Sequence, residues 1–167
     1  MRLASFALVL SALLLCAADW PHWRGPTRDG LTTESSGLKD GKWDLGKPLW
    51  SGNVGEGSSS PLLVGDRLYT LGHSDGKDHV VCLDAASGKE VWRNRLKGEY
   101  HASPLLIGGR IYCASTAGKM LVLEPKDTLA VIGESPLGEG TQATPAVAGG
   151  RLVVRTEGHL LCIAGKK

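Results

Sequence analysis

The chain has 167 residues, and its 19 lysines and arginines nearly balance its 17 acidic residues, with no run of like charges. A nucleic-acid partner or an anionic membrane surface calls for a basic face, so this balance argues against both. The length is enough for one domain with a hydrophobic core.

Residues 1–18 are typical of an export signal that is cleaved. Arg2 supplies the positive start, Leu3 to Leu15 form an apolar run, and small residues precede Asp19. The run is shorter than the ~20 residues that a spanning helix needs. We therefore expect a periplasmic or extracellular protein without a stable transmembrane span. Lipid anchoring at Cys16 stays open, although the leucine before it disfavours a lipoprotein signal.

Residues 19–46 form an N-terminal extension that is rich in tryptophan and glycine. It holds Trp20, Trp23 and Trp43, three of the five tryptophans of the chain. Indole rings are seldom left in water, and disordered tails contain few aromatic residues. The composition predicts an ordered segment that wraps over the surface of the domain.

One phrase recurs three times: SPLLVGDRLYTL from Ser60, SPLLIGGRIYCA from Ser103 and TPAVAGGRLVVR from Thr144. The prolines of the three copies lie 43 and 41 residues apart. A repeat of about 40–45 residues made of short strands is typical of one propeller blade. Residues 47–167 therefore predict an all-β fold, a partial β-propeller of about three four-stranded antiparallel blades.

The repeats divide into short apolar strands bounded by Gly, Asp or Pro. In the first repeat we expect strands at 61–64, 67–71, 79–83 and 90–95, with residues 72–78 as a loop. In the second repeat, after a Gly-Gly turn, we expect strands at 110–115, 120–124 and 129–133. In the third we expect 151–156 and 159–164. The first repeat thus occupies 47–71 and 79–95, the second 96–133 and the third 134–164. The third repeat lacks a fourth strand.

The missing strand has a counterpart upstream. Trp50 lies 42 residues before Trp92, one full repeat, so residues 47–54 are expected to form a strand of the fourth type. An N-terminal strand that completes the last blade removes a free sheet edge. Since three blades are too few for a closed ring, we expect two copies to pair as a homodimer of six blades.

The stretch VVCLDAASGKEVW resembles the repeat signature of the pyrroloquinoline-quinone-like (PQQ-like) β-propellers. Asp84 can accept hydrogen bonds from turn amides, and Gly88 can supply a positive φ. Trp92 is expected to pack between blades and to bond backbone through its indole N–H, and Trp50 stands at the matching position one repeat earlier. The second repeat departs from the signature, because Ile132 stands where a tryptophan is expected.

Within this family the chain is similar to the envelope assembly factor BamB, which lacks the quinone and holds partners with loops at one face. The resemblance implies a non-enzymatic, exported scaffold for protein binding or envelope assembly. Tyr100, His101 and Gln142 precede inner strands and are expected at the channel mouth, where a partner would be contacted. We predict no catalytic, cofactor-binding or metal-binding residue.

Two alternatives remain open. One is a PQQ-dependent quinoprotein oxidoreductase similar to the alcohol dehydrogenases of the family, which would require quinone, calcium and usually an adjacent cysteine pair. Cys82, Cys113 and Cys162 are not adjacent, and their apolar surroundings predict buried thiols. The other alternative is a shortened paralogue that has kept no activity.

Two groups of polar residues are candidate ligand sites. His73, Asp75, Asp78 and His79 lie within seven residues and could gather around a metal ion, but a solvated loop is the favoured interpretation. Two Gly-Glu-Gly copies, at Gly55 and Gly138, could line the channel mouth. We favour a role as connections between outer and inner strands.

Overall fold

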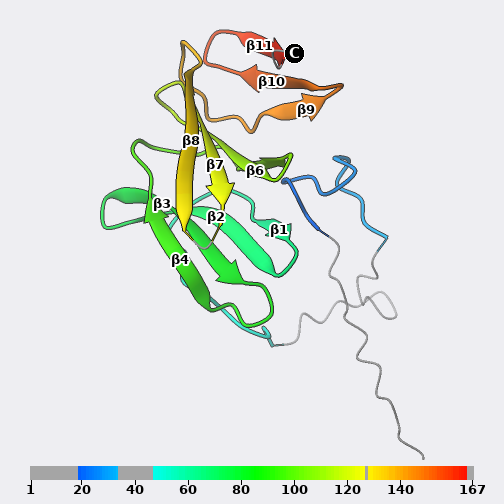
Figure 1. The fold of residues 1–167 in the computed structure, drawn as a ribbon, viewed down its shortest axis with the longest axis vertical. Coiled ribbons are helices and arrows are strands. Elements are labelled where there is room, and N and C mark those ends of the chain that lie inside the picture. The colour runs from blue at the N-terminus through cyan, green and yellow to red at the C-terminus, as the bar shows by residue number, and fades with distance from the viewer. Residues whose placement is uncertain (1–18, 34–46, 127, 165–167) are drawn as a thin grey trace, which may run out of the picture.

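The computed structural model of the chain describes residues 19–33, 47–126 and 128–164 (Figure 1). These residues form eleven strands and no helix. The predicted export signal lies outside the described residues, as do residues 34–46 of the extension. No helix within the described ranges is long and apolar enough to cross a membrane.

The strands make three antiparallel sheets in which neighbours in sequence are neighbours in space. The first blade contains β1 (Leu62–Val64), β2 (Arg67–Ser74), β3 (Lys77–Asp84) and β4 (Glu90–Arg95). The second blade contains β5 (Leu105–Ile107), β6 (Arg110–Ala114), β7 (Lys119–Pro125) and β8 (Leu129–Pro136). The third blade contains β9 (Ala146–Ala148), β10 (Arg151–Arg155) and β11 (Leu160–Ala164). The predicted partial all-β propeller is confirmed, including the absence of a fourth strand from the third blade within the described residues.

The hydrophobic core lies between successive blades. Alternate residues of each strand point to one face, so each sheet presents an apolar layer to its neighbour. Between the first and second blades, Leu71 and Val80 pack in one buried cluster with Ile111 and Leu123. A smaller cluster, with Met120 and Val154 among its members, joins the second and third blades. Burial of these layers stabilises the stack of blades.

The expected loop at residues 72–78 is wrong. β2 and β3 continue to within two residues of each other, and a turn of Asp75 and Gly76 joins them. Both turn residues have positive φ, 52° and 68°. An Asp-Gly pair with this geometry favours a two-residue hairpin turn whose twist matches that of the strands. The polar residues that suggested a loop are strand residues at the end of a long hairpin.

Residues 47–54 do not form the expected strand. They lie beside the first blade, where Arg93 Nη2 donates to Asn53 O at 2.8 Å and an isolated bridge joins Glu56 to His73. A strand needs a neighbouring strand with free backbone groups. None of the described strands of the first blade makes a ladder with residues 47–54, so the segment lies beside the blade without strand pairing.

The described part of the extension lies against the inner strands of two blades (Figure 1). Trp20 N donates to Leu63 O at 2.8 Å, and Leu63 N donates back to Trp20 O at 3.0 Å. Pro21 O accepts from Leu106 N at 3.0 Å. The extension therefore joins the free edges of β1 and β5, rather than covering the outer surface of the blades.

The cysteines differ in exposure, and the expectation of three buried thiols is wrong for one of them. Cys82 and Cys113 are free and buried between the first two blades, whereas Cys162 on β11 is free and exposed. The difference arises because no described blade covers the outer face of β11.

Candidate functional site

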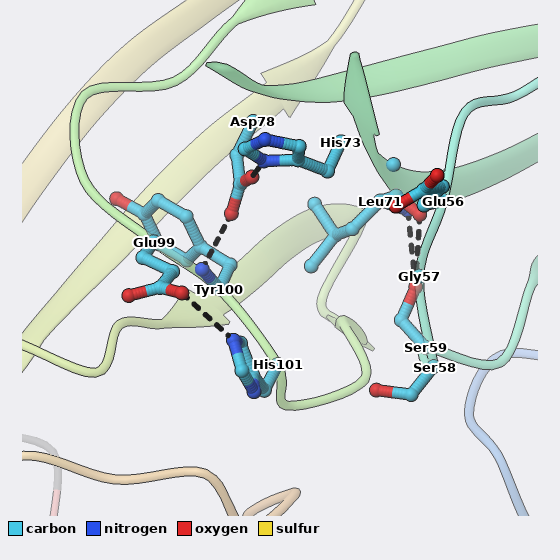
Figure 2. Close-up of a pocket in the computed structure, with 11 residues that line it drawn as sticks. Glu56, Gly57, Ser58, Ser59, Leu71, His73, Asp78, Glu99, Tyr100 and His101 are labelled. Carbon is cyan, nitrogen blue, oxygen red and sulfur yellow. Dashed lines mark hydrogen bonds and ion pairs between the residues drawn. The ribbon is translucent and has the colours of Figure 1, made fainter. Parts of the chain in front are cut away.

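A cavity of about 330 Å³ opens at one end of the first two blades (Figure 2). Its lining comes from the connection before β1, from the β2–β3 hairpin and from the connection between β4 and β5. Its lining includes Ser58, His73, Asp78, Glu99, Tyr100 and His101.

Asp78 organises the floor of this cavity. Its side chain is 8% exposed, and Oδ1 lies 2.6 Å from His73 Nδ1. Oδ2 accepts from Tyr100 N at 2.6 Å, and the main-chain carbonyl accepts from Leu96 N at 2.8 Å. Bonds from donors to a buried carboxylate are short and strong, and they compensate for its burial. Asp78 therefore ties the hairpin of the first blade to the connection that leads to the second.

Two of the three predicted channel-mouth residues meet in this cavity. Tyr100 is buried, and its hydroxyl donates to Lys97 O at 3.0 Å. Its burial raises the pKa of the hydroxyl far above the usual range. His101 is exposed at the rim, with Nε2 at 3.1 Å from Glu99 Oε1 (Figure 2). Tyr100 thus belongs to the floor, and His101 is accessible to a partner.

Gln142, the third predicted residue, does not line this cavity. It lies in a second depression of about 320 Å³ with Thr116 and Arg155, between the second and third blades. The repeat places Gln142 and His101 at matching points of their blades, and the different blades separate them. The sequence could not indicate which members of the repeat share a cavity.

The four residues weighed as metal ligands are divided by the hairpin. His73 and Asp78 face each other across β2 and β3, whereas His79 pairs with Gly72 and its Nδ1 lies 3.4 Å from Ser74 Oγ. Since adjacent strand residues point to opposite faces, Asp78 and His79 diverge. Within the described ranges no three His, Cys, Asp or Glu residues gather as a metal site.

Glu139, in the second Gly-Glu-Gly copy, holds the turn between β10 and β11. Its Oε2 accepts from Gly158 N at 2.9 Å and from Thr156 Oγ1 at 2.8 Å, and Oε1 lies 2.6 Å from His159 Nδ1. These bonds, that from Gly158 first, hold the pKa of the carboxyl below its usual value. Glu139 is used by the protein itself, which supports a structural role for this connection.

The repeat-signature residues of the first blade form one contact between segments, which we call a joint. Asp84 Oδ1 accepts from Ser87 Oγ at 2.6 Å and from Ser87 N at 2.8 Å, which lowers the pKa of the carboxyl. Gly88 has a φ of 67°, and a Cβ there would overlap the ring of Trp50. Trp50 Nε1 donates to Ala85 O at 3.1 Å. Residues 47–54 are therefore anchored by an indole ring on the turn between β3 and β4.

Trp92 makes the same joint one blade later. Its Nε1 donates at 3.0 Å to Lys126 O, in the connection between β7 and β8. The ring lies 6.0 Å from that of Tyr69, tilted by 48°. In both cases a tryptophan before one blade bonds a carbonyl in the last connection of that blade.

A second joint lies at the start of the recurring phrase, and sequence reasoning missed it. Ser60 N donates to Ser103 Oγ at 2.9 Å, and Ser103 N donates to Thr144 Oγ1 at 3.0 Å. Each hydroxyl thus accepts from the backbone of the preceding blade. The signal was present as a hydroxyl residue before the proline of every copy.

The repeated joints and three radial sheets define a PQQ-like β-propeller. The model of the family described as outer membrane protein assembly factor BamB matches residues 42–163, and the chain belongs to this family. A curated relative, the outer membrane protein assembly factor BamB of Burkholderia pseudomallei (strain K96243), is 29% identical over 122 residues. The match covers 71% of this chain and 31% of the relative, so the chain spans about a third of that protein.

Two solved structures are similar over part of their length. The crystal structure of BamB from Moraxella catarrhalis matches with a TM-score of 0.47 and 17% identity, covering 58% of this chain and 28% of that one. A europium-containing methanol dehydrogenase matches with a TM-score of 0.46 and 18% identity, covering 56% and 19%.

The alternative of a quinone-dependent dehydrogenase requires a calcium site. Calcium takes six to eight oxygen ligands, mostly carboxylates and carbonyls. No cluster of three acidic or histidine residues exists within the described ranges, and the sequence has no adjacent cysteine pair. The inner edges of β1 and β5 are also bonded to Trp20 and Pro21.

Proposed function

We propose that this protein is an exported, non-enzymatic scaffold that binds a protein partner during outer-membrane protein assembly. The match to the BamB assembly-factor family over residues 42–163 carries the proposal. Two acidic residues at the blade ends, Asp78 and Glu139, bond the protein's own hairpins and backbone, which supports a binding role rather than a catalytic one. Self-association, expected from the number of blades, is a separate proposal that does not depend on this role.

The partner is proposed to bind at the rim of the cavity between the first two blades. Ser58 is exposed there, and the side chains of Glu99 and His101 are 66% and 46% exposed. Asp78 and Tyr100 beneath them are buried and hydrogen-bonded, so the rim stands on a rigid floor. Polar connections on a rigid scaffold are where binding residues are commonly found.

Site-specific photo-crosslinking in a bacterial envelope tests this function. A photoreactive residue in place of His101 is expected to crosslink a component of the outer-membrane assembly machinery, identified by mass spectrometry. The matched control replaces Val131, which is 56% exposed on β8, away from the rim. Equal crosslinking at the two positions, or none to an assembly component, would contradict the proposed role.

Export is proposed on the signal pattern of residues 1–18, and fractionation tests it. We expect the protein in the periplasmic fraction with Asp19 as its first residue. Retention in the cytoplasm with Met1 intact would contradict export, and membrane association lost on Cys16→Ser would instead indicate a lipid anchor.

The proposal includes neither quinone nor calcium. Addition of pyrroloquinoline quinone with calcium is expected to leave the quinone absorbance unchanged and to give no dye-linked oxidation of alcohols. A saturable spectral change accompanied by alcohol oxidation would replace the scaffold with the oxidoreductase.

A further inference from the structure

The third blade has a sheet edge that no described strand covers. The third strands of the first two blades, β3 and β7, each pair with a strand on both sides. The third strand of the third blade, β11, pairs only with β10 among the described strands. The side chains of Leu160 and Ile163 on β11 are 69% and 41% exposed. A row of unpaired backbone groups beside exposed apolar side chains is a template for pairing with another strand.

The outer face of this blade carries residues at positions that are buried elsewhere. Leu160 and Cys162 stand in β11 where Val80 and Cys82 stand in β3, as the register with β10 and β2 shows. Val80 and Cys82 are each 1% exposed because the second blade covers them. The third blade thus presents an interblade face without a following blade.

Residues 47–54 are the counterpart of the missing strand. Trp50 makes the joint with the first blade that Trp92 makes with the second, and Trp92 belongs to β4. The segment therefore lies where the fourth strand of a preceding blade would lie. It pairs with no described strand, and Leu49 within it is fully exposed.

We propose that residues 47–54 of a second copy pair with β11 and become the fourth strand of the third blade. The exchange is reciprocal, so each copy completes the third blade of the other. Trp50 stays bound to the first blade of its own copy. Its indole N–H makes that contact, whereas strand pairing uses the backbone groups of residues 47–54. This inference stands whether or not the proposed assembly role holds.

The register of the exchanged strand follows from the first blade. There Val81 lies opposite Arg93, and Cys82 lies opposite Trp92. The same register places Leu161 of β11 opposite Ser51 of the second copy, and Cys162 opposite Trp50 of the second copy. The exposed thiol of Cys162 would then be covered by an indole, as Cys82 is beside Trp92.

The mass of the exported chain in solution is the first test. Sedimentation equilibrium is expected to give twice the mass of one chain, and Leu160→Lys is expected to shift the protein toward the single-chain mass. Val131→Lys places the same charge at a comparably exposed apolar residue of β8, and it is expected to leave the dimer intact. Circular dichroism checks that each variant keeps its β spectrum.

A single-chain mass for the unsubstituted protein would overturn the inference, and so would an equal effect of the two lysine variants. Assemblies larger than two chains would also overturn it, because they indicate open-ended pairing instead of a reciprocal exchange.

Disulfide crosslinking tests the register. In a Cys162→Ser background, Ser51→Cys with Leu161→Cys is expected to give a reducible dimer on a denaturing gel. The control combines Ser51→Cys with Val131→Cys, which the register keeps apart, and it is expected to remain a single chain. Equal crosslinking of the two pairs would contradict the exchange. Where Leu161→Cys prevents folding, the mass measurement decides.

The tests of the strand exchange and of the assembly role can fail independently. Loss of crosslinking at His101 with the dimer intact contradicts only the scaffold function, whereas a single-chain mass with assembly crosslinks intact contradicts only the strand exchange.

Discussion

Glycines and tryptophans at the blade joints show how single residues hold this fold together. A tryptophan can bond the carbonyl beneath it only where the turn leaves room for its ring. At the joint of Trp50 and Ala85 that room exists because Gly88 has no side chain. The signature of the first repeat is therefore a description of a contact between segments, in which the glycine and the tryptophan are one unit.

Gly88→Ala is expected to destabilise the protein more than Gly65→Ala. Both glycines have positive φ, 67° and 57°, so both substitutions cost about 1 kcal/mol of backbone strain. At Gly65 nothing lies within 4 Å of the new Cβ, whereas at Gly88 it meets the ring of Trp50. The overlap is expected to cost about 1–3 kcal/mol more. Urea unfolding measures both, and equal losses would show that the joint contributes nothing.

Glu139 is expected to make the stability of the protein depend on acid. Its pKa is lowered in the folded state from a usual value of 4.5, so its contribution is present above that pH and is lost as the pH falls through the folded pKa. Between pH 7 and pH 3 the melting temperature is expected to fall by less in Glu139→Gln than in the unsubstituted protein. Glu157→Gln, in the turn that Glu139 holds, is the control. Parallel losses in all three proteins would contradict this role.

At the scale of strands, sequence reasoning succeeded where the period-two pattern lay between clear turns. The predicted strands of the recurring phrase agree with the structure within one residue, except that β2 continues three residues beyond its expected end, because the Gly-Asp and Gly-Gly turns mark the other ends. It failed at residues 72–78, where polar residues outweighed an Asp-Gly turn in the interpretation. It failed again at residues 47–54, because a strand depends on its neighbour, and the neighbour is not encoded in the segment itself.

Prediction of the site residues was limited in the same way, because contacts between segments are not encoded in either segment alone. The repeat placed Tyr100 and His101 at a blade end, but burial of Tyr100 and separation of Gln142 depend on how blades pack. The sequence pattern suggests Asp78, the carboxylate that organises the cavity floor, only as a metal ligand. Its bond to Tyr100 N spans 22 residues and becomes visible only when the two connections meet.

Asp78→Asn is expected to loosen the contact between the first hairpin and the following connection. An amide has one accepting oxygen, so its NH₂ group would face either the Tyr100 N–H or the His73 ring. Loss of a charge-assisted bond at a buried position costs about 1.5–3 kcal/mol. Asp75→Asn, in a turn whose positive φ asparagine tolerates, is expected to change stability by less than about 0.5 kcal/mol. Urea unfolding compares the two, and similar losses would mean that Asp78 does not anchor the floor.

Across the whole molecule, the blades are stacked by contacts that repeat, and the two ends of the stack differ. The first blade is covered by residues 47–57 and bonded to the extension, whereas the third blade exposes a face and an edge. The extension is the only described segment outside the repeats, and it bridges β1 and β5. It therefore fixes the first two blades relative to each other.

Trp20→Ala is expected to release the extension, whereas Trp23→Ala is not. The ring of Trp20 covers Gly25, so its loss removes the packing that folds the extension back on itself. Trp23 is 50% exposed, and Arg24 lies 5.3 Å from the centre of its ring. Trypsin is expected to cut after Arg24 several times faster in Trp20→Ala than in the unsubstituted protein. Equal cutting in the two tryptophan variants would show that the extension is held elsewhere.

The bonds of Trp20 and Pro21 also set an order of events during folding. Trp20 pairs with Leu63 and Pro21 with Leu106. These two residues are therefore synthesised well before the residues with which they pair. Closing so long a loop is favourable only after the edges of β1 and β5 exist. The beginning of the domain is therefore expected to be the last part to lock, after the first two blades stand beside each other.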